Sequence, residues 1–311
     1  LADQTREQVR TAAMATIGLS IGVAFAVAMV LGPWLAAAFG LASVFWFTAG
    51  LAVLGLAVLW KLVPPAPRRL RHRDVGIDRG QLTEIFTRAD LWRLDLSIFS
   101  LHLVLMAIFV AVPFRLVESG IAAERHGLTY LAIMTLAFAA MVPLVVVAEK
   151  RQRMKGMSLA AIAAIVVSLA GLAAFEGRWA LFGWLLLFFI AFNLLEAMLP
   201  SMLSKLAPAG AKGTAMGVYS TSQFLGAFLG GVLGGLLAQQ WGLPSVFVGS
   251  AALAALWWLL MLGMPAPPHL SSEVVALDDE HQEDTLDTLM ASFADVAGVE
   301  DVLVVPEERV A

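Results

Sequence analysis

Eight runs of apolar residues, each long enough to cross a lipid bilayer, dominate this sequence. They cover residues 12–35, 43–63, 92–117, 127–148, 157–175, 179–205, 212–240 and 244–264. About 20 apolar residues cross the hydrocarbon core as a helix, and in lipid the backbone must satisfy its own hydrogen bonds. The composition agrees, because 60% of residues are apolar and only 14% are charged. The sequence therefore predicts an all-α polytopic membrane protein.

The first two runs contain a segment that returns 202 residues later. Residues 30–45 and 232–247 are identical at ten of sixteen positions without a gap. Chance identity between apolar segments is the alternative, which the shared helix–loop–helix context disfavours. The repeat unit then holds six spans, and copies six spans apart point the same way through the membrane. We therefore expect a twelve-span parent protein, of which this chain is a fragment with spans five to twelve.

Positive charges gather in alternate loops and predict the orientation. Sixteen Lys and Arg residues lie in one set of loops and three on the opposite side. Cytoplasmic loops carry an excess of Lys and Arg, so we expect a multi-pass protein of the bacterial inner membrane with the first set inside. Residues 270–311 hold one Arg and 12 acidic residues. This acidic, water-facing tail is then cytoplasmic as well. The loops of the first set are 1–11, 61–93, 149–156 and 205–212.

Two local patterns resemble motifs of the major facilitator superfamily. The run Ala28-x-x-x-Gly32-Pro33-x-x-Ala36 resembles its antiporter motif, with Ala at both outer positions where the family has Gly. The second pattern resembles a degenerate second copy of the family's cytoplasmic gate motif and includes Glu149, Lys150, Arg151 and Arg153. The resemblance implies a 6+6 helix fold, and it makes Asp3 the acidic residue that pairs with the arginine of the first gate motif.

Further patterns resemble YajR-like transporters, a drug:proton antiporter-like group within that superfamily. These patterns begin at Asp3, Phe192 and Lys212. The resemblance implies that residues 269–311 are part of a cytoplasmic α+β ferredoxin-like domain called YAM, with strands at 272–277 and 299–305 around a helix at 282–297. A disordered acidic extension is the alternative for so short a segment. The expected domains are the end of the N-terminal half (1–63), a cytoplasmic central loop (64–91), the C-terminal six-helix half (92–268) and this tail (269–311).

Glycines recur every four residues in the seventh run, at Gly226, Gly230 and Gly234. Small residues at this spacing let helices approach closely in lipid. One interpretation is tight static packing. The other is a sliding interface between the two halves of an alternating-access transporter, and both are compatible with the sequence.

Polar side chains inside the runs are candidates for proton coupling or substrate contact, because such groups are costly in lipid. His102 lies near the middle of its run, with Asp95 two turns earlier on the same face. Glu196 can exchange a proton or pair with a cationic substrate. A structural hydrogen bond is the alternative for His102, and an ion-pair latch is the alternative for Glu196. The remaining candidates are Asn193, which shares a helical face with Glu196, and Gln223 and Tyr219 in the seventh run.

Nothing in the sequence indicates an enzyme, a cofactor or a metal site. We expect instead a secondary transporter that exports small lipophilic or drug-like compounds in exchange for protons, by alternating access. Its partners are then a small-molecule substrate, protons and the lipid bilayer, with no nucleic acid. Two alternatives stay open: a metabolite or sugar uptake carrier of the same fold, and a membrane-anchored regulatory or binding protein that acts through its acidic tail.

Overall fold

The computed structural model describes residues 30–63, 85, 87–207 and 212–266, with the isolated positions 24, 27 and 28. Seven helices in this part of the chain are long and apolar enough to cross a membrane. Their ends lie within three residues of the predicted ones, because each span is delimited by charged or glycine-containing loops. The helices are α2 (Leu41–Leu62), α4 (Ala89–Glu118), α5 (His126–Lys150), α6 (Met154–Ala174), α7 (Arg178–Leu206), α8 (Lys212–Trp241) and α9 (Leu243–Leu262), with the short helix η3 (Ala123–Arg125) before α5.

Three expectations fall wholly or mainly outside the described residues. Only the end of the first predicted span is described, as a short apolar helix at Val30–Phe39. The central loop is described only at its C-terminal end, where α4 begins at Ala89. Asp3 and the expected tail domain at 269–311 lie outside the described residues.

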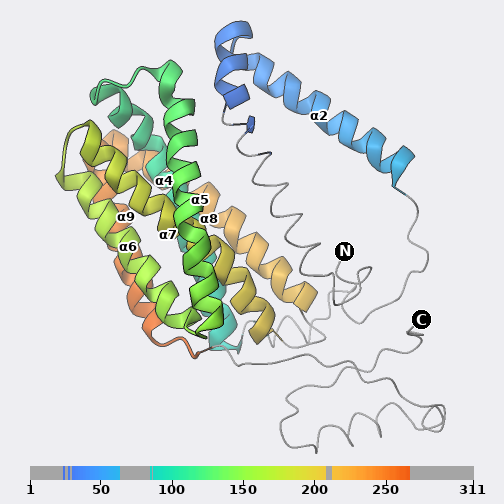
Figure 1. The fold of residues 1–311 in the computed structure, drawn as a ribbon, viewed down its shortest axis with the longest axis vertical. Coiled ribbons are helices and arrows are strands. Elements are labelled where there is room, and N and C mark those ends of the chain that lie inside the picture. The colour runs from blue at the N-terminus through green and yellow to red at the C-terminus, as the bar shows by residue number, and fades with distance from the viewer. Residues whose placement is uncertain are drawn as a thin grey trace, which may run out of the picture.

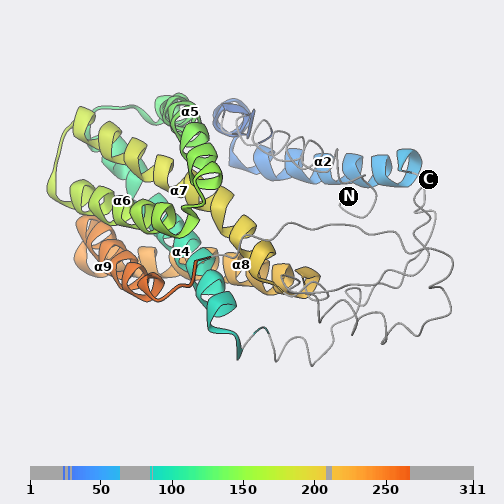
Figure 2. The same cartoon turned by 60° about the horizontal axis from the view of Figure 1, so that its bottom comes forward.

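Helices α4 to α9 form one bundle with α4 at its centre (Figures 1 and 2). Helix α4 packs against α7, α8 and α9, while α6 packs against α7 and α9, and α5 packs against α7. The core therefore runs along α4, where Leu91, Leu94, Ile98 and Leu101 are fully buried. Helix α2 has no buried residue and is drawn beside the bundle rather than within it.

The glycine stripe of α8 lies directly on the backbone of α4. A Cβ atom at Gly234 would stand 2.7 Å from the Cα of Ala107, which is too close for any side chain. Gly226 and Gly230 meet the α4 backbone in the same way at Phe99 and Leu103. Both partners advance in steps of four, so α4 and α8 pack in parallel. The glycine stripe therefore joins two helices of the same bundle. This contact agrees with tight static packing of the face.

The repeated segments adopt the same helix–glycine–helix turn. Gly40 has φ +83° and Gly242 has φ +82°, the left-handed region that glycine tolerates best. The backbone N–H of Gly40 donates to Ala36 O over 3.0 Å, and that of Gly242 donates to the equivalent Ala238 O over 3.0 Å. The hydroxyls of Ser43 and Ser245 each donate back to the glycine carbonyl, over 2.6 and 2.7 Å. The sequence repeat therefore corresponds to a repeat in local structure.

A hydrogen bond between helices anchors α9 to α4. The indole N–H of Trp257 donates to Ser97 Oγ over 2.9 Å, and both residues are buried. The Ser97 hydroxyl in turn donates to Arg93 O on its own helix. A buried indole N–H usually needs such a partner, so this contact fixes how α9 lies against α4.

At the C-terminal end of α4, the side chain of Arg178 contacts the loop that connects α4 to α5. Its guanidinium donates to Ser119 O over 3.4 Å and to Gly120 O over 3.1 Å. Gly120 has φ +81° and ends α4 with the N–H of Ile121 donating to Leu116 O, the bond pattern of a Schellman cap. The first residue of α7 thereby ties the end of α4 to the start of its own helix.

Candidate functional site

His102 sits on α4 in the interior of the bundle. The residue is 9% exposed, and its ring and that of Phe192 on α7 meet edge to face with centroids 5.7 Å apart. Its Nδ1 lies 3.2 Å from Ile98 O, one turn earlier on the same helix. A carbonyl oxygen only accepts, so Nδ1 carries the hydrogen. The other ring nitrogen, Nε2, then points away from α4 toward α7 and α8.

Three helices bring a histidine, an amide and a carboxylate together at this point. The amide Nε2 of Gln223 on α8 lies 2.8 Å from His102 Nε2. The same amide nitrogen donates to Glu196 Oε1 on α7 over 3.3 Å. Glu196 Oε2 lies 3.8 Å from His102 Nε2. The structure thus unites three candidates that are far apart in the sequence, and we call His102, Glu196 and Gln223 the central triad.

Two more candidates, Asp95 and Tyr219, are buried between the central triad and the N-terminal ends of α4 and α8. They are 7% and 3% exposed. Within the described residues, neither Asp95 Oδ1 nor the Tyr219 hydroxyl has a hydrogen-bond partner. Tyr219 is also within electrostatic range of Glu196 and Asp95. An unpartnered buried polar group costs free energy, so these two oxygens mark a second polar position in the core of the bundle.

Asn193 faces away from the central triad, although it is only three residues from Glu196. Its amide nitrogen lies 3.9 Å from Met134 Sδ on α5, while Glu196 contacts α8. An offset of three residues rotates a side chain by about 60° around the helix axis. On α7 that rotation separates the direction of α5 from that of α8. Asn193 is therefore placed on the α5 side of α7.

The antiporter-like residues are described in part. Ala28 is exposed, while Gly32, Pro33 and Ala36 lie in the short helix Val30–Phe39. A Cβ on Gly32 would meet no other atom within 4 Å. In the part of the chain that the structure describes, no helix therefore packs closely against this motif at Gly32.

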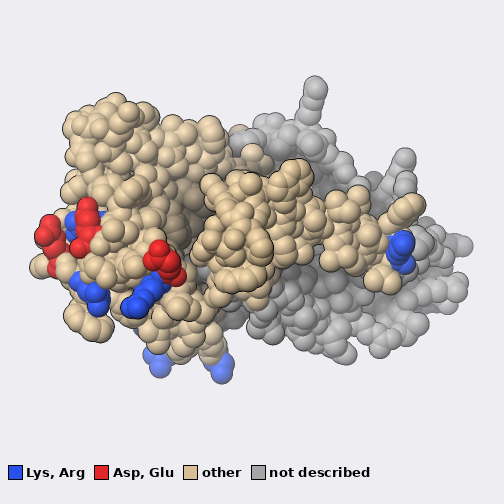
Figure 3. Space-filling view, turned by 90° about the horizontal axis from the view of Figure 1, so that it is seen from above, with Lys and Arg blue, Asp and Glu red and all other residues tan. Residues whose placement is uncertain are grey.

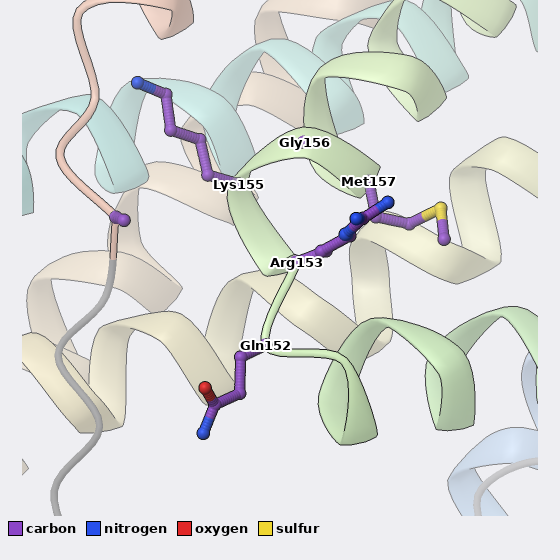
Figure 4. Close-up of a pocket in the computed structure, with 6 residues that line it drawn as sticks. Gln152, Arg153, Lys155, Gly156 and Met157 are labelled. Carbon is purple, nitrogen blue, oxygen red and sulfur yellow. The ribbon is translucent and has the colours of Figure 1, made fainter.

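The gate-like residues surround the connection between α5 and α6. Lys150 ends α5, and Arg151 and Arg153 are exposed; the side chain of Glu149 is outside the description. A cavity of about 350 Å³ lies here, and Figure 4 shows Gln152 and Lys155 pointing away from each other on either side of the connection. The cavity is lined by Gln152, Arg153, Lys155, Gly156, Met157 and Ala266.

The surface of the bundle fits a lipid environment. Seen from above in Figure 3, most of the described surface is free of Lys, Arg, Asp and Glu, which gather in small groups. Large apolar side chains such as Phe114, Phe224, Phe228 and Leu256 are exposed. A soluble monomer rarely exposes so much contiguous apolar surface.

Seven apolar helices in the described part of the chain and a lipid-compatible surface define a multi-pass membrane protein. A sequence model of the Major Facilitator Superfamily matches residues 1–231 and 153–294. The chain is also 40% identical over 310 residues to the inner membrane transport protein YajR of Escherichia coli strain K12, covering 99% of this chain and 68% of that protein. The chain belongs to the major facilitator superfamily and is accordingly a secondary transporter, as the motifs predicted.

Two further relatives carry the description uncharacterised transporter. One, from Buchnera aphidicola subsp. Schizaphis graminum, is 30% identical over 262 residues, or 83% of this chain and 67% of that protein. The other, from Buchnera aphidicola subsp. Acyrthosiphon pisum, is 29% identical over 229 residues, or 73% of this chain and 58% of that protein. Both agree with a transport protein rather than an enzyme.

Sequence reasoning missed one partner of the site, Phe192, whose ring lies against His102. It also did not predict the buried contact between Ser97 and Trp257, which joins α4 and α9. A signal for Gln223 was present, because this residue lies one turn before Gly226 on the face that approaches α4 most closely. That position turns Gln223 toward α4, where its amide reaches His102.

Proposed function

We propose that this protein exports small lipophilic compounds in exchange for protons across the bacterial inner membrane. The observation that carries the proposal is the central triad: an imidazole and a carboxylate, joined by an amide, inside a mostly apolar bundle. Ionisable groups at such a depth are retained mainly for function. Histidine and carboxylate side chains both exchange protons at accessible pH.

The triad lies on the face of the C-terminal half where the environment of its side chains would differ between the inward-open and outward-open conformations. Its members come from α4, α7 and α8, three helices of the proposed C-terminal half (92–268), and Glu196 is 38% exposed at its side chain. The proposed N-terminal half, of which residues 1–63 are the end, would face it across a midplane cavity. Binding of protons on one side and of substrate on the other would then favour opposite states of one rocking movement.

Asp95 and Tyr219 extend this polar track toward the cytoplasmic ends of α4 and α8. Their unpartnered oxygens suit bridging water between the triad and that side. The basic α5–α6 connection lies at the same end of the bundle, and the excess of Lys and Arg in these loops supports a cytoplasmic position for that end. The spans are mostly apolar, which favours a lipophilic substrate over a charged metabolite.

The direct test uses the full-length protein reconstituted in lipid vesicles with a lipophilic fluorescent dye. An imposed pH gradient is expected to drive the dye against its own gradient. Flux that does not respond to the pH gradient would refute proton exchange, and sugar or metabolite uptake in its place would favour the uptake carrier. Deleting residues 270–311 should leave flux in place, whereas loss of all activity would favour a regulatory role of the tail.

Single substitutions then test the residues. His102→Ala or Glu196→Gln is expected to remove most of the response of flux to pH. His126→Ala is the matched control, because His126 lies at the start of α5 and contacts Ile121 O rather than the triad. Unchanged pH dependence in both triad variants would clear these residues of a role in coupling.

A further inference from the structure

The first turn of α6 lies at the depth of lipid headgroups. Helix α6 has 21 residues, Met154–Ala174, and at 1.5 Å per residue it is about 30 Å long, which matches the hydrocarbon core of a bilayer. Trp258 of α9 supports this depth, because its indole N–H donates to Leu159 O in the second turn of α6 over 3.0 Å. Tryptophan is enriched where lipid meets water. A cavity at the start of α6 therefore opens to the polar part of the bilayer.

The cavity of about 350 Å³ at this turn combines positive charge with an apolar wall. Arg153 and Lys155 line it together with Met157 and Ala266, and none of its six lining residues is acidic. Within the described residues, neither cation forms an ion pair. Figure 4 shows their side chains leaving the first turn of α6 on different sides. An anion at this turn is therefore flanked by two cations that have no other counter-ion.

The start of α6 adds to the positive potential. No side chain caps this end, and its first turn has no acidic residue. The first backbone N–H groups of a helix have no partner within it, and together they act as about half of a positive charge. A Cβ on Gly156 would meet no other atom within 4 Å, so the first turn also leaves space for a ligand.

The surroundings of the cavity favour a membrane lipid over a soluble anion. Helix α6 packs against α7 and α9, and Figures 1 and 2 show α6 and α9 along one flank of the bundle. The last turns of α9, which lead to Ala266, expose Leu259 and Leu262. A phospholipid can place its phosphate at the cations and its acyl chains along this apolar surface, whereas a soluble anion uses only the charge.

We propose that this cavity binds the phosphate of an anionic phospholipid, with Arg153 and Lys155 as the charged ligands. Lys and Arg residues next to membrane spans attract anionic lipids, and basic pockets between spans bind their headgroups. The lining residues come from the α5–α6 connection, from α6 and from the segment after α9. The bound headgroup thus holds these three segments together. The site is separate from the central triad and does not depend on proton exchange.

The test is native mass spectrometry of the full-length protein in detergent, with equal amounts of phosphatidylglycerol and phosphatidylcholine added. We expect the wild type to retain one phosphatidylglycerol in preference to phosphatidylcholine. Each cation near a membrane surface contributes about fivefold to the binding of anionic lipid. The double variant Arg153→Gln with Lys155→Gln should therefore lower the preference about 25-fold.

Arg151→Gln is the matched control, because Arg151 is exposed on the same connection but does not line the cavity. It also removes one positive charge, and we expect it to leave most of the preference in place. Gly156→Leu fills the cavity without changing the charge, and it is expected to reduce retention of phosphatidylglycerol as the double variant does. If one cavity variant does not fold, the other still tests the site, because it perturbs a different property.

Equal retention of the two lipids by the wild type overturns the proposal, as does a loss of preference in Arg151→Gln that equals the loss in the cavity variants. A preference that appears only after deletion of residues 270–311 would mean that the acidic tail occupies the cavity, which also overturns it. Displacement of phosphatidylglycerol by an equal concentration of inorganic phosphate would assign the cavity to a soluble anion instead.

Discussion

Adding one methyl group to the glycine stripe should push α8 away from α4. In Gly234→Ala the new Cβ would stand 2.7 Å from Ala107 Cα and 2.8 Å from Ala107 O, which is about 0.7 Å short of ordinary contact. Both atoms belong to the backbone, so no side-chain rotation relieves the clash and the helices must separate. Overpacking of this kind costs about 1–3 kcal/mol. We therefore expect the free energy of unfolding of Gly234→Ala to lie about 1–3 kcal/mol below that of a variant with the same substitution at an open position of α8.

Gly235→Ala is the matched control, because a Cβ at Gly235 meets nothing within 4 Å. Both substitutions gain the same helix propensity, about 1 kcal/mol in water, so this contribution cancels when the two variants are compared. The assay is unfolding of the full-length protein in mixed micelles with increasing SDS. Equal stability of the two variants, or a more stable Gly234→Ala, would show that the close approach of α4 and α8 does not limit this fold.

Two further substitutions test the contacts that hold the bundle ends. Trp257→Phe deletes the donor to Ser97 and is expected to destabilise the protein by about 0.5–1.5 kcal/mol, whereas Trp179→Phe, at a residue that is 84% exposed, should change the midpoint of thermal unfolding little; equal shifts would contradict the role of this bond. Gly120→Ala places a side chain at φ +81° and a Cβ 3.1 Å from Arg178 Nη2, so we expect a loss of about 1–2 kcal/mol, and wild-type thermal stability would contradict it.

The sequence predicted the positions of the seven described spans, but it did not predict which helices pack against one another. Apolar length predicted seven spans within three residues of the observed ends, because crossing lipid requires a minimum length that few other structures need. The glycine spacing at 226, 230 and 234 predicted a close approach. It did not predict α4 as the partner, since small residues make a helix face smooth without specifying which helix covers it.

The sequence predicted the candidate residues one by one, and the structure brings three of them into contact. His102, Glu196 and Gln223 stood out because polar groups are expensive in lipid, but their union depends on how α4, α7 and α8 cross. Asn193 shows the limit of helical spacing, because a face wide enough to include Glu196 also reaches a second neighbour, α5. The expectations for Asp3 and for the tail at 269–311 stay predictions, since both lie outside the described residues.

The hydrogen bonds between Arg178 and the C-terminal end of α4 affect how sequences of related proteins can be compared. Their two acceptors are main-chain oxygens, those of Ser119 and Gly120, which every amino acid supplies. No substitution at either position can create or remove the acceptor, so evolution leaves no correlated pair of changes at this contact. Methods that infer proximity from co-evolving residues would miss it. Its only trace among related sequences would be an arginine kept at 178 and a glycine kept at 120, with no paired substitutions between them.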